Sequence, residues 1–206
     1  MVTIVDYGVG NLASIKNMLK KAGSDSLISS QEADLLAAEK LILPGIGAFD
    51  ACAEKLTQSG LIQVLNKKVL ENKTPILGIC VGLQLLLNGS EEGKLPGLGW
   101  IKGKVVRFDA RKLNASHKVP HMGWTEISVA KPSSLFTEMY EDPRFYFVHS
   151  YYADPVDRNN VLAYAHYGYD FAAALEYENI LGVQFHPEKS HKFGLKLMEN
   201  FVSHYK

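Results

Sequence analysis

The sequence of 206 residues predicts an α/β fold: three layers, α/β/α, with a central mostly parallel sheet and a β-rich second half. Three observations lead to this expectation. Apolar strands alternate with helices in the first hundred residues, short alternating strands follow Trp100, and an amphipathic segment closes the chain. Since no linker, repeat or low-complexity tract divides the sequence, we expect residues 1–206 to form a single domain whose halves share one sheet.

The first half contains three units of strand, tight turn and helix. A strand is expected at residues 2–5, and the apolar residues at 12, 15 and 19 give the following helix one apolar face. The same order recurs with strands at 41–43 and 75–79, each followed by a glycine turn or cysteine and a helical stretch. Continuous apolar strands joined by helices are typical of a parallel sheet covered on both faces.

The second half has a different pattern. Strands of alternating polarity are expected at residues 104–108 and 145–148, separated by Gly, Pro and Asn turns. Residues 190–206 close the chain with the apolar side chains Phe193, Leu197 and Phe201 four apart, which predicts a helix packed on the sheet.

Charge and hydropathy exclude several classes of function. Lys and Arg number 22 against 22 Asp and Glu, so no positive excess exists to bind nucleic acid or an anionic membrane. The longest apolar run, residues 75–87, is shorter than the roughly 20 residues that cross a bilayer. Because the start lacks the pattern of a signal peptide, we expect a cytoplasmic protein, in which the two cysteines form no disulfide framework.

The strongest chemical signal is Cys80 in the segment GICVG at residues 78–82, where an apolar strand gives way to a helix. This pattern indicates a nucleophile elbow with cysteine in place of serine, in which small flanking residues permit a strained turn that presents the nucleophile. The start of the helix favours the reactive thiolate. Alone, the motif is equally compatible with a small buried cysteine used for close packing.

A thiol that expels an amine needs a base and an oriented carboxylate, and His186 and Glu188 provide the best candidates. They follow a strand at residues 180–183, and Pro187 favours an extended backbone at His186. Residues i and i+2 of an extended segment point to the same side. An arbitrary pair of this spacing is more often a strand-end histidine beside a solvated glutamate, but a cysteine elbow in the same chain reverses that preference.

Acyl transfer also requires donors for the developing oxyanion. The backbone amide of Val81, directly after the nucleophile, supplies one. The glycine turn at residues 44–47 is the expected source of the second, through Ile46 or Gly47, and the sequence leaves open which amide points inward. Gln84 lies one helical turn after Cys80 on the same face and is expected to line the substrate pocket.

Other motifs are weaker indications of function. Residues 8–13 fit the dinucleotide fingerprint G-x-G-x-x-A, with Glu32 about 20 residues on, but Glu32 does not clearly end a second strand. Cys52 has no nearby histidine and is expected to serve in packing. His117 and His121 lie around Pro120 and are not expected to share a helix, so a zinc site is not predicted. We expect no metal and no cofactor.

These motifs together resemble the class I (triad) glutamine amidotransferases. The resemblance rests on PGIGAF at 44–49, GICVGLQ at 78–84 and FHPEKS at 185–190. DYGVGN at 6–11, SEEG at 90–93, KVPHMGW at 118–124 and FVHSY at 147–151 are similar to the glutaminase subunits of imidazole glycerol phosphate synthase within that family. The motifs run in order through nearly the whole chain.

The resemblance implies hydrolysis of glutamine to glutamate and ammonia, with the ammonia passed to a synthase subunit in histidine biosynthesis. That partner would be a (β/α)8 barrel bound as a heterodimer, whose ligand stimulates the glutaminase. Cys80 would attack the amide, His186 would transfer the proton and Glu188 would orient it. The resemblance further assigns glutamine binding to Gln84, Glu92, Ser150 and Tyr151, and the partner-facing surface to Asn11, Trp124 and Lys189.

Three alternatives remain. Residues 99–101 (GWI) and 190–194 (SHKFG) are similar to paralogues that supply ammonia for amidinating surface-polysaccharide sugars. A stand-alone cysteine hydrolase would need no partner, and a docking subunit without activity would not need Cys80, His186 and Glu188.

Overall fold

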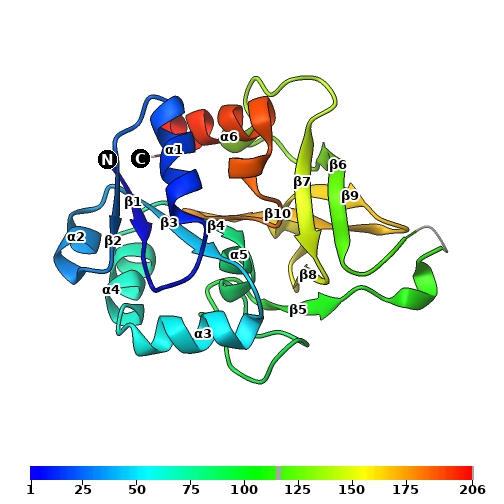
Figure 1. Cartoon of the computed structure of the whole chain (residues 1–206), viewed down its shortest axis with the longest axis horizontal. Coiled ribbons are helices and arrows are strands. Elements are labelled where there is room, and N and C mark those ends of the chain that lie inside the picture. The colour runs from blue at the N-terminus through cyan, green and yellow to red at the C-terminus, as the bar shows by residue number, and fades with distance from the viewer. Residues whose placement is uncertain (115–116, 206) are drawn as a thin grey trace.

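The computed structural model describes residues 1–114 and 117–205 and contains one mixed sheet of eleven strands (Figure 1). The strand order is β2-β1-β3-β4-β11-β10-β9-β6-β7, with β8 paired to β10 and β5 paired to β8. The strands are β1 Val2–Val5, β2 Ser26–Ser29, β3 Lys40–Gly45, β4 Ile76–Cys80, β5 Gly103–Arg107, β6 His121–Val129, β7 Arg144–His149, β8 Tyr151–Pro155, β9 Val161–His166, β10 Asp170–Tyr177 and β11 Ile180–Val183. The α-helices are α1 Leu12–Lys21, α2 Glu32–Ala37, α3 Phe49–Gln58, α4 Ile62–Asn66, α5 Val81–Leu85 and α6 His191–His204.

The parallel half of the sheet consists of β2, β1, β3, β4 and β11. Figure 1 shows α1 and α6 above this half and α3, α4 and α5 below it. All residues of β1, β4 and β11 are buried, as expected for strands covered by helices on both faces. The predicted three-layer α/β/α arrangement is therefore confirmed.

The antiparallel half begins where β10 pairs with β11, and it continues through β9, β6 and β7. The β-rich second half and the single shared sheet are both confirmed. β11 is the junction, because it runs parallel to β4 on one side and antiparallel to β10 on the other. A crevice at such a change of direction, outside the carboxyl ends of the parallel strands, is where α/β proteins bind ligands.

The edge strand of the parallel half, β2, was not predicted. It is only half-buried at three of its four positions, so its sequence SLIS lacks a continuous apolar run. It ends three residues before Glu32, which is exposed and begins α2. The final helix was predicted at residues 190–206 and corresponds to α6, while Lys206 lies outside the described residues.

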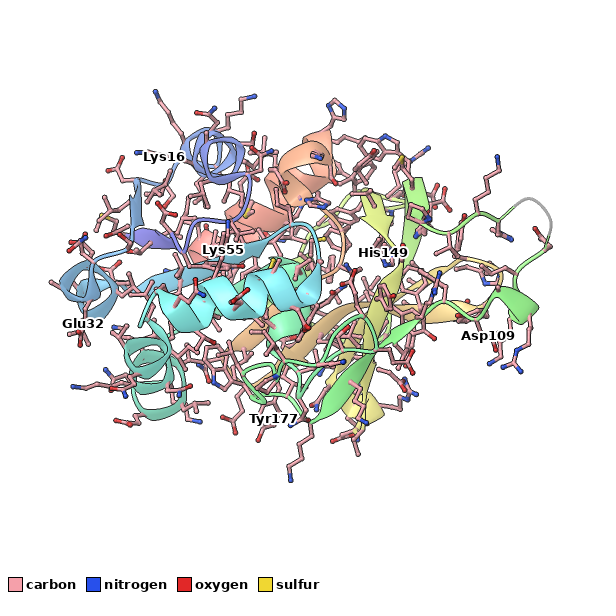
Figure 2. All side chains as sticks on the ribbon, turned by 60° about the horizontal axis from the view of Figure 1, so that its bottom comes forward. Lys16, Glu32, Lys55, Asp109, His149 and Tyr177 are labelled. Carbon is pink, nitrogen blue, oxygen red and sulfur yellow. The ribbon has the colours of Figure 1, made fainter. Side chains whose placement is uncertain are left out.

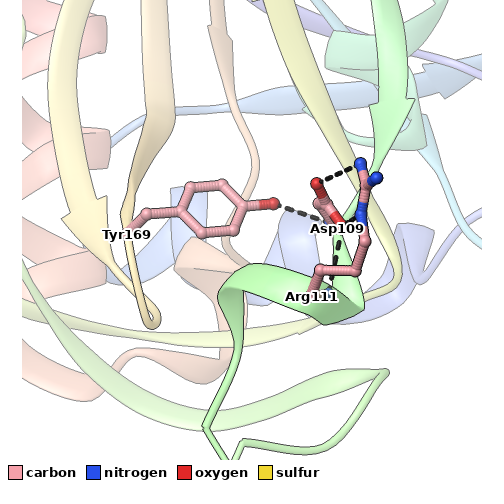
Figure 3. A network of polar contacts seen from close by, with 3 residues as sticks. All are labelled: Asp109, Arg111 and Tyr169. Carbon is pink, nitrogen blue, oxygen red and sulfur yellow. Dashed lines mark hydrogen bonds and ion pairs between the residues drawn. The ribbon is translucent and has the colours of Figure 1, made fainter.

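The loop after β5 is held against the turn that precedes β10 by a small polar network (Figure 3). The Asp109 amide donates to the Tyr169 hydroxyl oxygen at 2.9 Å, and the Arg111 Nε donates to Asp109 Oδ1 at 2.9 Å. The hydrogen bonds from Arg111 and its guanidinium charge lower the pKa of Asp109 to about 2. The network fixes the position of the neighbouring Phe108, whose ring lies 5.2 Å from that of His149.

Aromatic side chains join the sheet to the segment that follows β11. Phe145 of β7 stacks on Phe185 with ring centroids 3.9 Å apart, and Phe147 meets Phe185 edge-on at 5.5 Å. All three side chains are fully buried.

None of the helices in residues 1–114 and 117–205 has the length and apolar character needed to cross a bilayer.

Candidate active site

Cys80 ends β4 in a backbone conformation that side chains rarely adopt, with φ 56° and ψ −112°, and α5 begins at the next residue. The turn needs glycine on both sides. A Cβ atom at Gly82 would lie 1.9 Å from the Leu43 carbonyl oxygen, and one at Gly78 would lie 2.7 Å from the Gly82 carbonyl oxygen. The sequence GICVG therefore produces the strained strand-to-helix turn that the elbow motif predicts.

His186 and Glu188 lie beyond the end of β11, and β11 is the neighbour of β4 in the sheet. The His186 backbone is extended, and its Nδ1 lies 2.8 Å from Glu188 Oε1, so the predicted orientation of the two side chains is confirmed. Both side chains are at most 3% exposed. Because the carboxylate only accepts, Nδ1 carries the proton donated to Glu188, which directs Nε2 away from the carboxylate.

The electrostatics of His186 favour its charged form. Burial lowers its pKa, but hydrogen bonds to Cys80 and Glu188 and the negative charges of those groups outweigh burial and raise the pKa to about 9. The charged form of His186 is therefore favoured at neutral pH, between Cys80 and Glu188. Such a pair provides a nucleophile together with a proton for the leaving group.

One pocket of about 380 Å³ contains Cys80 and His186. Its size lies in the range of small-molecule sites. All predicted oxyanion and substrate residues line it, namely Ile46, Gly47, Val81, Gln84, Glu92, Ser150 and Tyr151. Lys189, expected to face a partner, also lines this pocket, whereas Asn11 and Trp124 do not.

Two of the substrate-binding candidates are fixed by hydrogen bonds. Glu92 Oε2 accepts from the Phe49 amide at 2.8 Å, at the first residue of α3. Gln84 Nε2 donates to the Tyr151 carbonyl at 3.2 Å and to Gln184 Oε1 at 3.1 Å. The pocket walls are thus held in place by groups from both halves of the sheet.

The glycine turn after β3 is supported from its far side. The Tyr7 hydroxyl donates to the Pro44 carbonyl at 2.6 Å, and Cys52 Sγ donates to the Ile46 carbonyl at 3.2 Å. Cys52 is fully buried, in keeping with its expected packing role, and burial raises the pKa of its thiol so that the donating proton is kept. The fingerprint-like segment packs on the same turn, since a Cβ atom at Gly10 would lie 2.8 Å from Pro44 Cβ.

The partner-facing candidates occupy the surface near the pocket. On β6, Met122 is 61% exposed and Trp124 is 44% exposed. The Trp124 ring stacks on His191 with centroids 5.4 Å apart and an interplanar angle of 17°. The exposed Lys189 places its ammonium 5.6 Å from the Tyr146 ring, and Asn11 directly precedes α1. Met122, Trp124 and Lys189 therefore provide exposed apolar and cationic side chains.

Three buried polar residues near the site were not predicted from the sequence: Gln184, His121 and His149. Gln184 has a signal, because it precedes His186 by two in an extended segment and so faces the same side. The two histidines lie in the motifs KVPHMGW and FVHSY, but their contact with each other has no sequence signal, since it arises only through the pairing of β6 with β7. Within residues 1–114 and 117–205, no group of three or more His, Cys, Asp or Glu side chains is placed to hold a metal ion.

Comparison with known proteins gives consistent relatives. The sequence model of the family described as glutamine amidotransferase class-I matches residues 3–205. The chain is 52% identical to the imidazole glycerol phosphate synthase subunit HisH 2 of Methanococcus maripaludis, over 98% of each chain. It is 49% identical to HisH 2 of Pseudomonas aeruginosa, again over 98% of each, and 46% identical to HisH of Leptospira borgpetersenii over 98% of this chain and all of the relative.

Solved structures share the fold at low sequence identity. A putative GMP synthase component from Thermoplasma acidophilum superposes with a TM-score of 0.71 at 22% identity, covering 98% of this chain and 91% of the other. PurLQS from Thermotoga maritima gives the same TM-score at 21% identity, covering 98% and 96%. With the family match spanning nearly every residue, the chain belongs to the class I glutamine amidotransferases.

Proposed function

We propose that this chain is the glutaminase subunit of an imidazole glycerol phosphate synthase, and that it hydrolyses glutamine with Cys80, His186 and Glu188 as its catalytic residues. The observation that carries this proposal is the strained Cys80 elbow in one pocket with a buried, charge-paired His186. The names of the relatives at 46–52% identity support the assignment to this synthase.

The chemistry follows from the two ionised partners. The Cys80 thiolate attacks the side-chain amide carbon of glutamine, and the carbonyl oxygen takes up the negative charge. His186 gives its proton to the amide nitrogen and the C–N bond breaks. Ammonia departs, and the acyl group remains bound to Cys80 as a thioester. Water then loses a proton to His186 as it attacks the thioester, and glutamate is released. Glu188 keeps His186 in the productive tautomer and stabilises its positive charge.

The pocket walls provide the remaining contacts. The backbone amide of Val81, together with an amide of the turn at Ile46 or Gly47, would donate to the oxyanion. Glu92 offers a carboxylate to the α-ammonium group of glutamine. Gln84, Ser150 and Tyr151 line the same pocket. Lys189 lines the pocket and is exposed at the surface.

A partner would dock where the exposed Met122 and Trp124 lie beside Lys189. Exposed Trp and Met side chains of this kind dominate the binding energy of many interfaces. The relatives are named as subunits of a synthase, which supports a second subunit here as well. We infer that it is the (β/α)8-barrel subunit that consumes the ammonia, bound as a heterodimer.

A second candidate function is ammonia supply for amidinating a surface-polysaccharide sugar. Two observations favour keeping it. The two relatives at 52% and 49% identity are both named HisH 2. His191, in the segment that resembles the surface-sugar paralogues, stacks on Trp124 within the proposed docking surface. A changed docking surface with an unchanged active site would redirect the same ammonia to another acceptor.

Glutamate release from glutamine tests both proposals. The chain is assayed alone and with the histidine-pathway synthase subunit of the same source and its ribosyl nucleotide substrate. We expect strong stimulation by the partner, and complete loss of hydrolysis in Cys80→Ala with partner binding kept, because the thiol is needed only for the covalent step.

Each result has a distinct meaning. Near wild-type hydrolysis by Cys80→Ala would refute the mechanism. Stimulation that requires Cys80 supports the histidine-pathway subunit. A folded chain that this synthase does not stimulate favours the surface-sugar candidate, and strong activity without any partner favours a stand-alone hydrolase.

A further inference from the structure

Two buried histidines take no part in the mechanism above, yet they are hydrogen-bonded to each other, and one of them, His149, lines the pocket. His121 of β6 and His149 of β7 are directly paired across the two strands, and His121 Nδ1 lies 3.1 Å from His149 Nε2. Both side chains are buried, and Figure 2 labels the position of His149. A buried polar pair needs a reason, because an apolar pair would avoid the desolvation of four ring nitrogens.

Both imidazoles are neutral. Burial lowers the pKa of His149 to about 3, despite its hydrogen bond to the Tyr151 carbonyl, and the nearby His121 and His186 lower it further. Burial and His117 lower the pKa of His121 to about 4. The rings of Phe108, Phe147 and Phe171 pack around both histidines. Each imidazole therefore has one donating and one accepting nitrogen.

The direction of every hydrogen bond follows from one backbone carbonyl. The Tyr151 carbonyl only accepts, so His149 Nδ1, at 2.8 Å, carries the proton and His149 Nε2 must accept. His121 Nδ1 therefore donates to His149. Its Nε2 then accepts from the Thr125 hydroxyl at 2.8 Å. The hydrogen bonds are therefore all donated in the same direction, from Thr125 to His121, from His121 to His149 and from His149 to the Tyr151 carbonyl.

The same carbonyl fixes two amide side chains. Gln84 must direct its NH2 group towards Tyr151, because its oxygen would otherwise face another acceptor. The second proton of that NH2 group reaches Gln184 Oε1 at 3.1 Å. Gln184 is thereby held with its own NH2 group on the other side, where Nε2 lies 3.8 Å from Cys80 Sγ. No other orientation of Gln184 satisfies its neighbours.

We propose that Gln184 is a further catalytic residue that donates a hydrogen bond to the Cys80 thiolate, and that His121 and His149 are positioning residues that hold it through Tyr151 and Gln84. The inference rests on the proposed glutaminase function, since it assigns these residues to the same nucleophile. A donor aimed at the sulfur stabilises its charge without adding a proton acceptor that competes with His186.

Gln184→Met and His149→Phe test the two ends of this series of hydrogen bonds. Methionine keeps the length of Gln184 without its donor, and phenylalanine fits the aromatic surroundings of His149 without donating to Tyr151. Glutamate release by the full chain with its synthase partner gives kcat and KM. Iodoacetamide alkylation of Cys80, followed by mass spectrometry of its peptide at a fixed neutral pH, reports the thiolate without any substrate.

We expect Gln184→Met to lower both kcat and the alkylation rate about tenfold, the size of a lost hydrogen bond to a charged group. His149→Phe should lower both several-fold, with KM within about twofold of wild type in both variants. His149→Asn, whose amide still reaches the Tyr151 carbonyl, should recover most of the loss. His204→Phe, a histidine exposed at the end of α6, is the matched control and should leave both rates unchanged.

Unchanged kcat and alkylation in folded Gln184→Met overturns the proposal, and this variant decides alone if His149→Phe does not fold. Equal loss in His149→Asn and His149→Phe refutes the role of the histidines. If the wild-type chain releases no glutamate, the proposed function fails, while the alkylation rates still decide whether Gln184 and the histidines act on Cys80.

Discussion

At the scale of single residues, the charge state of His186 depends on two partners that the fold brings to it. Burial of His186 lowers its pKa, and the interactions with Cys80 and Glu188 raise the pKa again and favour the charged form. Glu188 Oε2 is buried without a hydrogen-bond partner among the described residues, so the carboxylate is committed to the histidine through Oε1 alone. The acid–base properties of the site therefore depend strongly on the charge of this glutamate.

Replacing Glu188 with Gln should move the alkaline limit of the reaction. The carboxylate raises the pKa of His186, so its loss lowers that pKa from about 9, and glutamate release should decline at lower pH than in wild type. We expect kcat to fall about 10²-fold at neutral pH, less than in Cys80→Ala. The pH dependence of kcat with saturating glutamine measures both effects.

The same change affects stability with a defined sign. Because the folded pKa of His186 lies above its unfolded value of about 6.5, its contribution to the free energy of unfolding is complete below that pH and is lost as pH rises through about 9. Glu188→Gln should lower the pH at which this contribution to the free energy of unfolding is lost. An unchanged alkaline limit in the variant would show that Glu188 does not control the protonation of His186.

At the scale of elements, the elbow depends on the close approach of α5 to β3. Gly82 lies so near Leu43 that even a methyl group would meet its carbonyl oxygen. α5 has only five residues and is buried throughout, so its position is set by this contact more than by its own helical stability.

Gly82→Ala should therefore lower the free energy of unfolding by about 3 kcal/mol or more, since the atoms it meets belong to a central strand and not to a flexible side chain. Gly89→Ala is the matched control. Its new Cβ would lie 3.7 Å from the Leu95 carbonyl oxygen, which is an ordinary contact, so we expect little change. Urea denaturation measures both, and equal stability of the two variants would contradict the tight packing of α5.

The elements that the sequence predicts best are those whose signal is local. The strands β1, β3 and β4, the elbow and the orientation of His186 towards Glu188 all follow from a few consecutive residues. Strand β2 was missed because its half-buried residues give no apolar run. The role of Cys52 and the pairing of His121 with His149 depend on contacts between distant segments, which no local pattern records.

At the scale of the whole molecule, both halves share one sheet, so we expect them to unfold as one cooperative unit. The chain has two tryptophans, one in each half. The Trp100 indole donates to Asn66 Oδ1 at 2.8 Å in the parallel half, and Trp124 lies on β6 of the antiparallel half. Each can report the unfolding of its own surroundings.

Trp100→Phe and Trp124→Phe each leave one tryptophan as the reporter. In both variants we expect the denaturation curves from fluorescence and far-UV circular dichroism to coincide, because both halves contribute strands to one sheet. Midpoints that differ between the two probes in either variant would show that the halves unfold separately.

The place of β11 in the sheet has a consequence for synthesis. This strand is synthesised after β1 to β10, yet it lies between β4 and β10 in the middle of the sheet and leads directly to His186 and Glu188. A growing chain on the ribosome therefore carries Cys80 without its base and cannot close its sheet. We therefore expect a product truncated before β11 to release no glutamate from glutamine.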